Sequence, residues 1–515
     1  MITIDILPDD VLLVVFDFYV GDVREIEAWQ SLVHVSRRWR CLLFGSPRRL
    51  NLQLVCTPRA LARATLDVWP ALPLVIQGHI SPSSGVDNTV VALMRSSRVC
   101  KIDLWGSSGS ESEEILAAMQ QPFPEITHLR LGAYDAPVVP DSFLGGSAPR
   151  LQCLHLERIP FPGLPNLLLS SIYLVELHLH GIPETGYLPP EVMATCLSAL
   201  TSLERFSLGS YPLNSLYRES QRPPPPTCIF PALTYFQFKG DPEYLDDFVA
   251  RIDIPLLSNL HIIFFTEYGF DAPQLAEFIS RTPRLNVPDE AHVIFHHESV
   301  MIRFISQTFG HAELRVEIPC TESDWQLPSL TEVCTLCLPP LPMVEILCIN
   351  HLLSPGGWNS DIENALWLNF LRPFSGAKSL FLSRKFASGV GSSLKELILD
   401  RIMEVLPNLK NIFADGRESE EMKDIERFVD ARRLSGHPIN ISLKDRPLEL
   451  DWFKVKHLRD VPPFRPPTPP APAPAPAPRQ VHRGPTRNPY VPSSSPGPYR
   501  ARRHYHQPIS LSPPY

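Results

Sequence analysis

The stretch ILPDDVLLVVF (residues 6–16) decides the fold of the first fifty residues of this chain. Pro8 lies where a helix can begin, and Asp9 can cap it. Apolar side chains then recur at helical spacing, at Val11, Leu12, Val15 and Phe16. This spacing predicts an amphipathic helix, and Gly21 with Asp22 is expected to end it.

Two further stretches, WQSLVHV (residues 29–35) and SRRWRCLLF (residues 36–44), predict two more short helices. The second helix would carry Ile26, Trp29, Leu32 and Val33 on one face. Ser36 can cap the third, whose inward residues would be Trp39, Leu42 and Leu43. Three helices of about ten residues bury little apolar surface alone, so they need a partner or the rest of the chain.

The motifs LPDDVL (residues 7–12), Val15-Phe16 and VSRRWR (residues 35–40) together resemble the F-box. This module attaches a substrate receptor to the Skp-type adaptor of a cullin-RING ubiquitin ligase. The resemblance covers roughly residues 5 to 50, within an F-box domain expected at 1–50, although the loop between the first two helices is longer and more acidic than in many F-boxes. It implies that the adaptor contacts Leu7, Pro8, Leu12, Val15 and Phe16. It also implies an F-box core of Trp29, Val35 and Trp39. An ordinary helical cap on a larger domain is the alternative.

Composition and charge exclude several classes of protein. The 515 residues include no apolar run of about 18, so no membrane span is expected, and no secretory signal is recognised. Ten scattered cysteines suggest free thiols in the cytoplasm or nucleus. The net charge is −8, and the seven arginines after Asp460, with no acid among them, leave −15 on the preceding residues. That balance speaks against nucleic-acid binding by the folded part.

Beyond a connecting segment at residues 51–80, a sequence unit repeats. Its core is an apolar residue followed by further apolar residues three and five positions later. The copies are Ile126/Leu129/Leu131, Leu151/Leu154/Leu156, Leu174/Leu177/Leu179, Leu203/Phe206/Leu208, Leu233/Phe236/Phe238 and Leu257/Leu260/Ile262. Their starts lie roughly 23 to 30 residues apart, as in leucine-rich repeats, and each core predicts a short strand.

Helical patterns separate these strands, at residues 114–119, 190–200, 241–249 and 271–279. Strand alternating with helix predicts an α/β fold, with residues 81–445 forming a curved solenoid of parallel strands. The later copies lose the regular spacing. There the sequence predicts a helix at 393–406, a last strand at 409–413 and a capping helix at 425–438.

The segment from residue 461 to 515 is predicted to be disordered. It contains PPAPAPAPAP (residues 469–478), which favours extended polyproline conformation, and it has no apolar periodicity with which to bury a core.

No motif indicates catalysis, a cofactor or a metal. Cys334 and Cys337 have zinc-ligand spacing, but residues 333–338 are predicted to be extended, which points the two thiols to opposite faces. Gly389-Val390-Gly391 is interpreted as a loop before a helix. Phosphate-loop and nucleophile-elbow motifs are absent from the sequence, so an enzyme is not expected.

The residue between the last two apolar positions of each repeat should point away from the core, toward the concave face. These residues are Arg130, His155, His178, Ser207, Gln237, His261 and, one copy later, Arg315. One interpretation is that they are simply the solvent-exposed side of the half-buried strands. Alternatively they bind a substrate, since solenoids recognise partners with this face. The candidate substrate-binding residues are Arg130, His155, His178, Gln237 and His261. Basic and titratable groups suit an acidic or phosphorylated segment, bound more tightly at mildly acidic pH.

Together these features predict a non-catalytic substrate receptor of a Skp-cullin-F-box type ubiquitin ligase. Its partners would be the adaptor, through it the cullin and RING subunits, and a protein substrate. The alternative is a scaffold that binds the adaptor without delivering substrates for degradation.

Overall fold

The computed structural model describes residues 4–444, with gaps at 23–27, 60–61, 81–84, 108, 135–137, 211–227, 267–268, 308–311, 321, 340, 352–362, 398–400 and 416–421. The chain divides into two units, Met1–Leu450 and Asp451–Tyr515, and every described residue belongs to the first. The predicted disordered segment, residues 461–515, lies outside the described residues.

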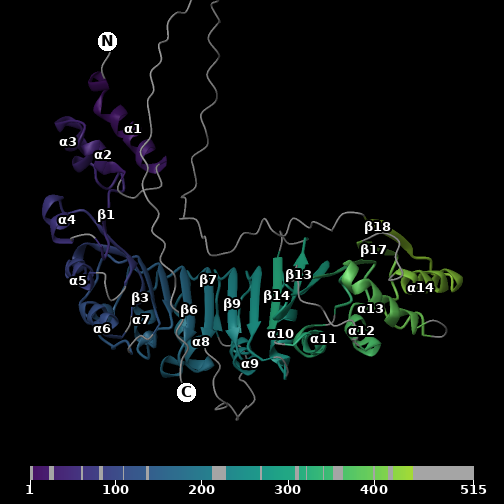
Figure 1. Cartoon of the computed structure of the whole chain (residues 1–515). Helices are drawn as coiled ribbons and strands as arrows, with labels where there is room; N and C mark the ends of the chain where they lie inside the picture. The colour runs from purple at the N-terminus through teal and green to yellow at the C-terminus, as the bar shows by residue number, and fades with distance from the viewer. Residues whose placement is uncertain are drawn as a thin grey trace, which may run out of the picture. The chain divides into compact units, whose positions relative to one another are not determined.

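Short helices begin the described chain, as the sequence predicts (Figure 1). They are η1 (Ile4–Ile6), α1 (Asp9–Asp22), α2 (Trp29–Val33) and α3 (Arg37–Gly45). Helix α1 continues through Gly21 and Asp22, where the sequence predicted its end. The predicted cap of α3 is present, because the Ser36 hydroxyl accepts a hydrogen bond from the Trp39 amide at 3.2 Å.

Aromatic side chains hold these helices together and attach them to the segment that follows. The Trp39 and Phe16 rings lie 4.8 Å apart between centroids. Trp29 is fully buried, its indole N–H donates to the Gln53 carbonyl at 2.9 Å, and its ring lies 5.1 Å from that of Trp69. The rest of the chain thus supplies part of the cover that three short helices lack.

One predicted core residue is wrong. Val35 is 58% exposed, although the resemblance placed it in the core. It follows the end of α2 at Val33, in the turn before α3, where the chain no longer faces the other helices. Leu32 and Val33, one turn of helix beyond Trp29, are buried instead.

Sixteen strands of the described residues form one sheet, and helices follow it along one side (Figure 1). Its first half consists of parallel strands in chain order. They are β1 (Leu54–Cys56), β2 (Leu74–His79), β3 (Val99–Ser107), β4 (His128–Ala133), β5 (Cys153–Glu157), β6 (Glu176–Ile182), β7 (Arg205–Ser210), β9 (Tyr235–Gly240) and β11 (Asn259–Phe264). Strands β8 (Cys228–Ile229) and β10 (Ile252–Asp253) pair separately.

Helices connect these strands, and four of them lie close to the ranges predicted at 114–119, 190–200, 241–249 and 271–279. They are α4 (Ala62–Val68), α5 (Val86–Leu93), α6 (Gly109–Ala118), α7 (Leu164–Ser170), α8 (Pro190–Ser198), α9 (Pro242–Val249) and α10 (Pro273–Arg281). Three short turns of 3-10 helix, η2 (Ser96–Arg98), η3 (Phe143–Gly146) and η4 (Glu184–Gly186), lie among them.

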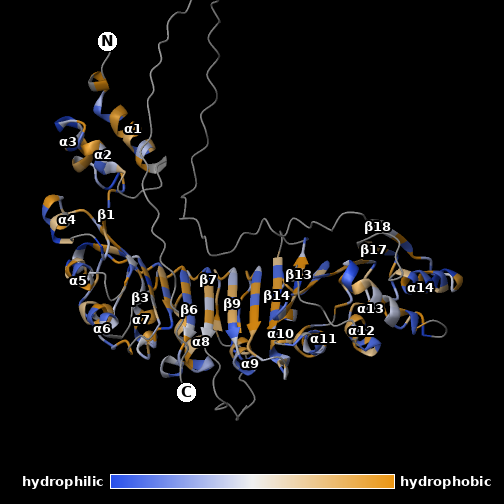
Figure 2. Cartoon of the chain, viewed as in Figure 1, coloured by the Kyte–Doolittle hydropathy of each residue, from blue (hydrophilic) through white to orange (hydrophobic). Residues whose placement is uncertain are grey.

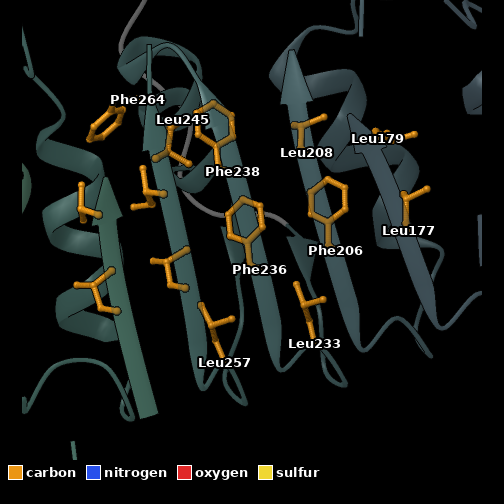
Figure 3. Packing of buried hydrophobic residues seen from close by; sticks show 14 of the residues in the cluster. Leu177, Leu179, Phe206, Leu208, Leu233, Phe236, Phe238, Leu245, Leu257 and Phe264 are labelled. Carbon is orange, nitrogen blue, oxygen red and sulfur yellow. The ribbon is translucent and has the colours of Figure 1, made fainter. Parts of the chain in front are cut away.

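The apolar repeat residues form the core between sheet and helices. Along β5 and β6 the burial alternates from one residue to the next, and Leu177 is fully buried. Figure 3 shows the apolar side chains of neighbouring strands stacked in rows, with Phe206 beside Phe236 at 5.4 Å between ring centroids. Figure 2 shows the resulting alternation of hydrophobic and polar residues along the strands.

The second half of the sheet departs from the predicted all-parallel stack. After β11 the order is β14 (Ala312–Pro319), β13 (Ser299–Ser306) and β12 (Glu290–Phe295), and β13 is antiparallel to both neighbours. Only residues 296–298 separate β12 from β13. Such a connection allows a hairpin but not a helical crossover, which explains why the repeat spacing is lost here.

The C-terminal elements also differ from the prediction. The sheet continues with β15 (Ile346–His351), β16 (Ser379–Leu382), β17 (Asn411–Asp415) and β18 (Asn440–Lys444), and the helices are α11 (Ser323–Glu332), α12 (Asn364–Leu371), α13 (Arg384–Lys395) and α14 (Lys423–Leu434). Helix α13 ends at Lys395, so the helix predicted at 393–406 is wrong over most of its length. The predicted strand at 409–413 and capping helix at 425–438 correspond to β17 and α14, but β18 follows them, so β17 is not the last strand.

Two glycines that the sequence placed in a loop lie inside helix α13. A Cβ atom on Gly391 would stand 2.8 Å from Ile425 Cγ1, so the absence of a side chain allows α13 and α14 to pack closely. The glycines mark a close helix contact rather than a turn.

The segment carrying Cys334 and Cys337 is also misassigned by the sequence. Residues Val333–Cys337 form a single turn of π-helix (η5), not an extended segment, and both thiols are buried. The turn continues α11 directly, so the chain does not leave the helix before Leu338.

We expect Trp39→Ala to destabilise the N-terminal helices by about 3–5 kcal/mol, because it removes a buried indole that contacts Phe16. Hydrogen exchange of α1 and α3 amides, read by mass spectrometry on the full chain, measures the change. Val35→Ala is the control. Its side chain is largely exposed, so its effect should stay within about 0.5 kcal/mol. Equal protection in both variants would contradict the assigned helix packing.

Candidate interaction surfaces

The face of the sheet opposite the helices, here called the open face, carries a continuous row of side chains in register. The row is Asp103, Arg130, His155, His178, Ser207, Gln237, His261, Arg315, Arg303, His292 and Cys348. The structure brings all five candidate substrate-binding residues into this row. Their role in binding remains a prediction.

Asp103 begins the charged part of the row and was not singled out by the sequence. Its carboxylate lies 3.8 Å from the Arg130 guanidinium and accepts a hydrogen bond from the Trp105 indole at 3.1 Å. It belongs to the strand before the first recognised repeat, and only the β3–β4 register identifies it as a neighbour of Arg130. Arg130 is therefore already opposed by an acidic group.

Three histidines gather on β5 and β6 beside this pair. The ring centroid of His155 lies 5.5 Å from that of His178 and 5.3 Å from that of His180. The centroids of His178 and His180 are 6.0 Å apart. The Trp105 ring lies 5.8 Å from His155. The sequence-based candidates omit His180. Residues two apart on a strand share a face, so the sequence His178-Leu179-His180 could have predicted that His180 lies beside His178.

The charge state of His155 and His180 bears on the expected pH dependence. Burial, followed by the nearby His180, His178 and Arg130, lowers the pKa of His155 to about 3. Burial and the neighbouring His178 and Lys239 lower the pKa of His180 to about 4. At mildly acidic pH both rings are neutral, so protonation of His155 cannot tighten the binding of an acidic segment there.

Acidic side chains also neutralise the basic groups farther along the row. The Glu317 Oε2 atom lies 3.9 Å from His261 Nε2 and 2.8 Å from a guanidinium nitrogen of Arg315. Arg303 pairs with Glu313 at 2.6 Å. Arg205 and His178 both approach Glu176, at 4.0 and 3.7 Å. The open face is thus a mixed-charge surface, not the basic strip that the single row of residues suggested.

The last strands present a different chemistry on the open face. The row continues from Cys348 to Phe381, Phe413 and Ser442. The two phenylalanine rings stack with centroids 4.4 Å apart and are half-buried. This part of the row carries no charge, so the open face changes from ionic to aromatic along the sheet.

A second surface lies on helix α1. Its exposed apolar side chains are Val11, Val14, Val15, Phe18 and Tyr19, of which Phe18 is 75% exposed. Ile6, just before the helix, is also exposed. Among the predicted adaptor-contact residues, Pro8 and Val15 are exposed, Leu7 is half-buried, and Leu12 and Phe16 are fully buried. Leu12 and Phe16 therefore serve the internal core, and they cannot be surface contacts as the helices stand.

The start of α1 is fixed by one arginine. Arg38 donates to the Leu7 carbonyl at 2.7 Å and to the Asp9 carboxylate at 2.5 Å. This links the N-terminus of α1 to α3. The exposed apolar face therefore lies on a helix whose start is held in place.

Several other kinds of site receive no support in the part of the chain that the structure describes. No helix there is long and apolar enough to cross a membrane. No group of three or more His, Cys, Asp or Glu side chains there could hold a metal ion. The ten cysteines are not joined by disulfide bonds. Burial raises the pKa of the Cys348 thiol to about 12, so it remains protonated near neutral pH.

No protein-family model matches this chain, and neither does any curated protein. The assignment of function therefore depends on the sequence motifs and on the two surfaces described above.

The ion pairs of Glu317 predict a pH-dependent contribution to stability. The neighbouring His261 and Arg315 hold the pKa of Glu317 near 2, below its ordinary 4.5. A carboxyl group whose pKa is lower in the folded than in the unfolded protein stabilises the fold at pH values above the unfolded-state pKa. This stabilisation is lost as the pH falls toward the folded-state pKa. We expect Glu317→Gln to lower the free energy of unfolding at pH 6, with a deficit that shrinks between pH 4.5 and the folded pKa of about 2. Urea unfolding at a series of pH values measures it.

The matched control is Glu298→Gln, because the Glu298 side chain is 84% exposed. Its difference from the wild type should not vary with pH. A Glu317→Gln deficit that is constant over the same range would contradict the ion-pair origin.

Proposed function

We propose that this chain is a non-catalytic receptor subunit of a Skp-cullin-F-box type ubiquitin ligase. In this proposal the N-terminal helices bind the Skp-type adaptor and the open face of the sheet binds a protein substrate. Other subunits transfer ubiquitin, and this chain contributes proximity by holding two proteins in one complex. The expected location is the cytoplasm or nucleus.

The observation that carries the proposal is the apolar face of α1 beside the F-box-like motifs. A surface helix normally turns its apolar side chains inward, and Leu12 and Phe16 of α1 do so. Val14 and Phe18, on the other side of the same helix, stay exposed. A helix that is apolar on both sides is expected at an interface, where a partner covers the second side.

The exposed face also refines which residues would bind the adaptor. Exposed apolar anchors dominate affinity in such interfaces, whereas side chains buried in the free protein contribute through the shape of the helix. Within the described residues the anchors are Ile6, Val11, Val14, Val15 and Phe18, together with Pro8. Leu12 and Phe16 support this surface from behind.

The substrate part of the proposal rests on the continuous open-face row. The row runs over nine neighbouring strands, from β3 to β13, before it reaches β12. Because acidic side chains beside the row pair with its basic groups, the face suits a polar segment with mixed charges better than a uniformly acidic one. The stacked Phe381 and Phe413 offer an aromatic contact at the far end of the same face.

The alternative function is a scaffold that binds the adaptor without delivering substrates for degradation. Both functions use the α1 surface, so adaptor binding does not separate them. Copurification of cullin and RING subunits, together with a bound protein whose level rises when this chain is deleted, favours the receptor.

The adaptor proposal predicts that Val14→Asp together with Phe18→Asp abolishes adaptor capture without unfolding the helices. Both side chains are exposed, so the free protein loses little packing, while the interface would have to bury two charges. Pull-down of purified Skp-type adaptor by the full chain measures the effect, and we expect a loss of at least about a hundred-fold in affinity.

Leu434→Asp is the matched control, because Leu434 on α14 is 88% exposed and lies far from α1 in the chain. It should bind the adaptor as the wild type does. Unchanged capture by the Val14 and Phe18 double variant would overturn the assignment of α1 as the adaptor surface.

The substrate proposal predicts that replacing Arg130, His155 and His178 together by alanine reduces substrate capture but not adaptor binding. Affinity purification from native cells through a tagged full chain, with quantitative mass spectrometry, compares the captured proteins. The control is His297→Ala, since His297 lies between β12 and β13 and its side chain is 66% exposed. If the triple variant captures the same proteins in the same amounts, the row is only the solvated side of the sheet.

A further inference from the structure

The three histidines on β5 and β6 belong to a longer aromatic surface on the open face. The Trp105 indole on β3 lies 5.8 Å from the His155 imidazole on β5, between ring centroids. His155 lies in turn 5.5 Å from His178 and 5.3 Å from His180, both on β6. These four rings, here called the aromatic platform, are each half-buried and together span the strands from β3 to β6.

Gly132 on β4 makes this continuity possible. In the strand register it lies between Trp105 on β3 and Glu157 on β5. A Cβ atom on Gly132 would stand 2.5 Å from the Cε3 atom of Trp105. The indole therefore occupies the space that a side chain of β4 would otherwise fill, and it reaches His155 across that strand.

Two of the imidazoles in the platform are uncharged near neutral pH. The pKa of His155 is about 3 and that of His180 is about 4, and in both cases burial is the first cause. The Trp105 indole carries no charge either, and its N–H donates to Asp103 at 3.1 Å. The face of an indole attracts cations, and a planar guanidinium also stacks on neutral aromatic rings. The platform therefore suits a guanidinium group.

Glu157 places a negative charge beside the platform that no cation offsets. Its carboxylate lies 3.9 Å from Nε2 of the neutral His155, and it forms no ion pair with an arginine or lysine among the described residues. Asp103, in contrast, already faces Arg130 at 3.8 Å. The side chain of Glu157 is 33% exposed, so a ligand on the open face can reach the carboxylate.

We propose that the aromatic platform and Glu157 bind an arginine side chain of a partner protein. The guanidinium stacks against the rings and donates its N–H groups to the Glu157 carboxylate. Arginine fits better than lysine, because its planar group combines stacking with a two-pronged hydrogen bond to a carboxylate. The inference rests on the proposed substrate role of the open face and narrows it, because the bound segment must carry an arginine.

The test is selection from a random library of short synthetic peptides by the immobilised full chain, followed by sequencing of the retained peptides. We expect arginine to be at least about three times as frequent as lysine among them. Glu157→Gln and Trp105→Leu should each remove this preference. Glu298→Gln is the matched control for the lost charge, since Glu298 is exposed and lies outside the platform, and it should select as the wild type does.

Gly132→Ala tests the geometry while every ring and charge stays in the chain. The added methyl group displaces the Trp105 indole, so the preference for arginine should fall. Gly209→Ala on β7 is the matched control, because a Cβ atom there meets nothing closer than Lys239 Cβ at 3.5 Å. Thermal melting of each variant shows that the fold is retained.

Three results overturn the inference. They are retention of no peptide, equal frequencies of arginine and lysine, and a preference for arginine that survives in Glu157→Gln and Trp105→Leu. Pull-down of the Skp-type adaptor by the same proteins separates this inference from the proposed function. Adaptor capture without selection of arginine leaves the receptor proposal standing and removes the arginine site. Selection of arginine by a chain that captures no adaptor does the reverse.

Discussion

The common register of the repeat positions on neighbouring parallel strands is the constraint on which the rest of the structure depends. From β4 to β11 the same positions of the repeat stand opposite one another, with Leu154 beside Leu177 and Phe206 beside Phe236. Because side chains alternate between faces, a slip of one residue would turn the apolar row toward water and bury the polar row. The helices can cover the sheet only because every strand keeps the same phase.

The same constraint creates the electrostatics of the open face. Strands about 4.8 Å apart force successive polar side chains into contact, whatever their chemistry. Where the row repeats histidine, the rings crowd and desolvate one another, and the pKa of His155 falls to about 3. Burial and neighbouring rings thus favour the neutral form of His155. Where a carboxylate lies beside basic groups, the charged form is favoured instead, and the pKa of Glu317 falls to about 2.

Local spacing predicted much of this architecture. It identified the strands from β4 to β11 and the row that contains Arg130, His155 and His178. Helix α3 was also predicted, because Ser36 is a local cap. The place of the β12–β13 hairpin in the sheet was missed, since the pairings that fix it, β11 with β14 and β12 with β15, join residues far apart in the sequence. Gly391 was misinterpreted for the same reason: its close contact is with Ile425, thirty-four positions along the chain. The ionic partners Asp103 and Glu317 follow from strand register, which the sequence does not display.

The paired charges of the open face bear on what the surface can select. Each arginine that already contacts a carboxylate gains little from a second acidic partner, and the partner must also give up its hydration. An acidic ligand would meet repulsion from Asp103 beside Arg130 and from Glu317 beside Arg315. In the proposed substrate role, the face would therefore select a segment that carries charges of both signs. The mixed row therefore favours discrimination between segments over strong attraction to any acidic one. The uncharged Phe381 and Phe413 stack adds an apolar contact that is independent of that pattern.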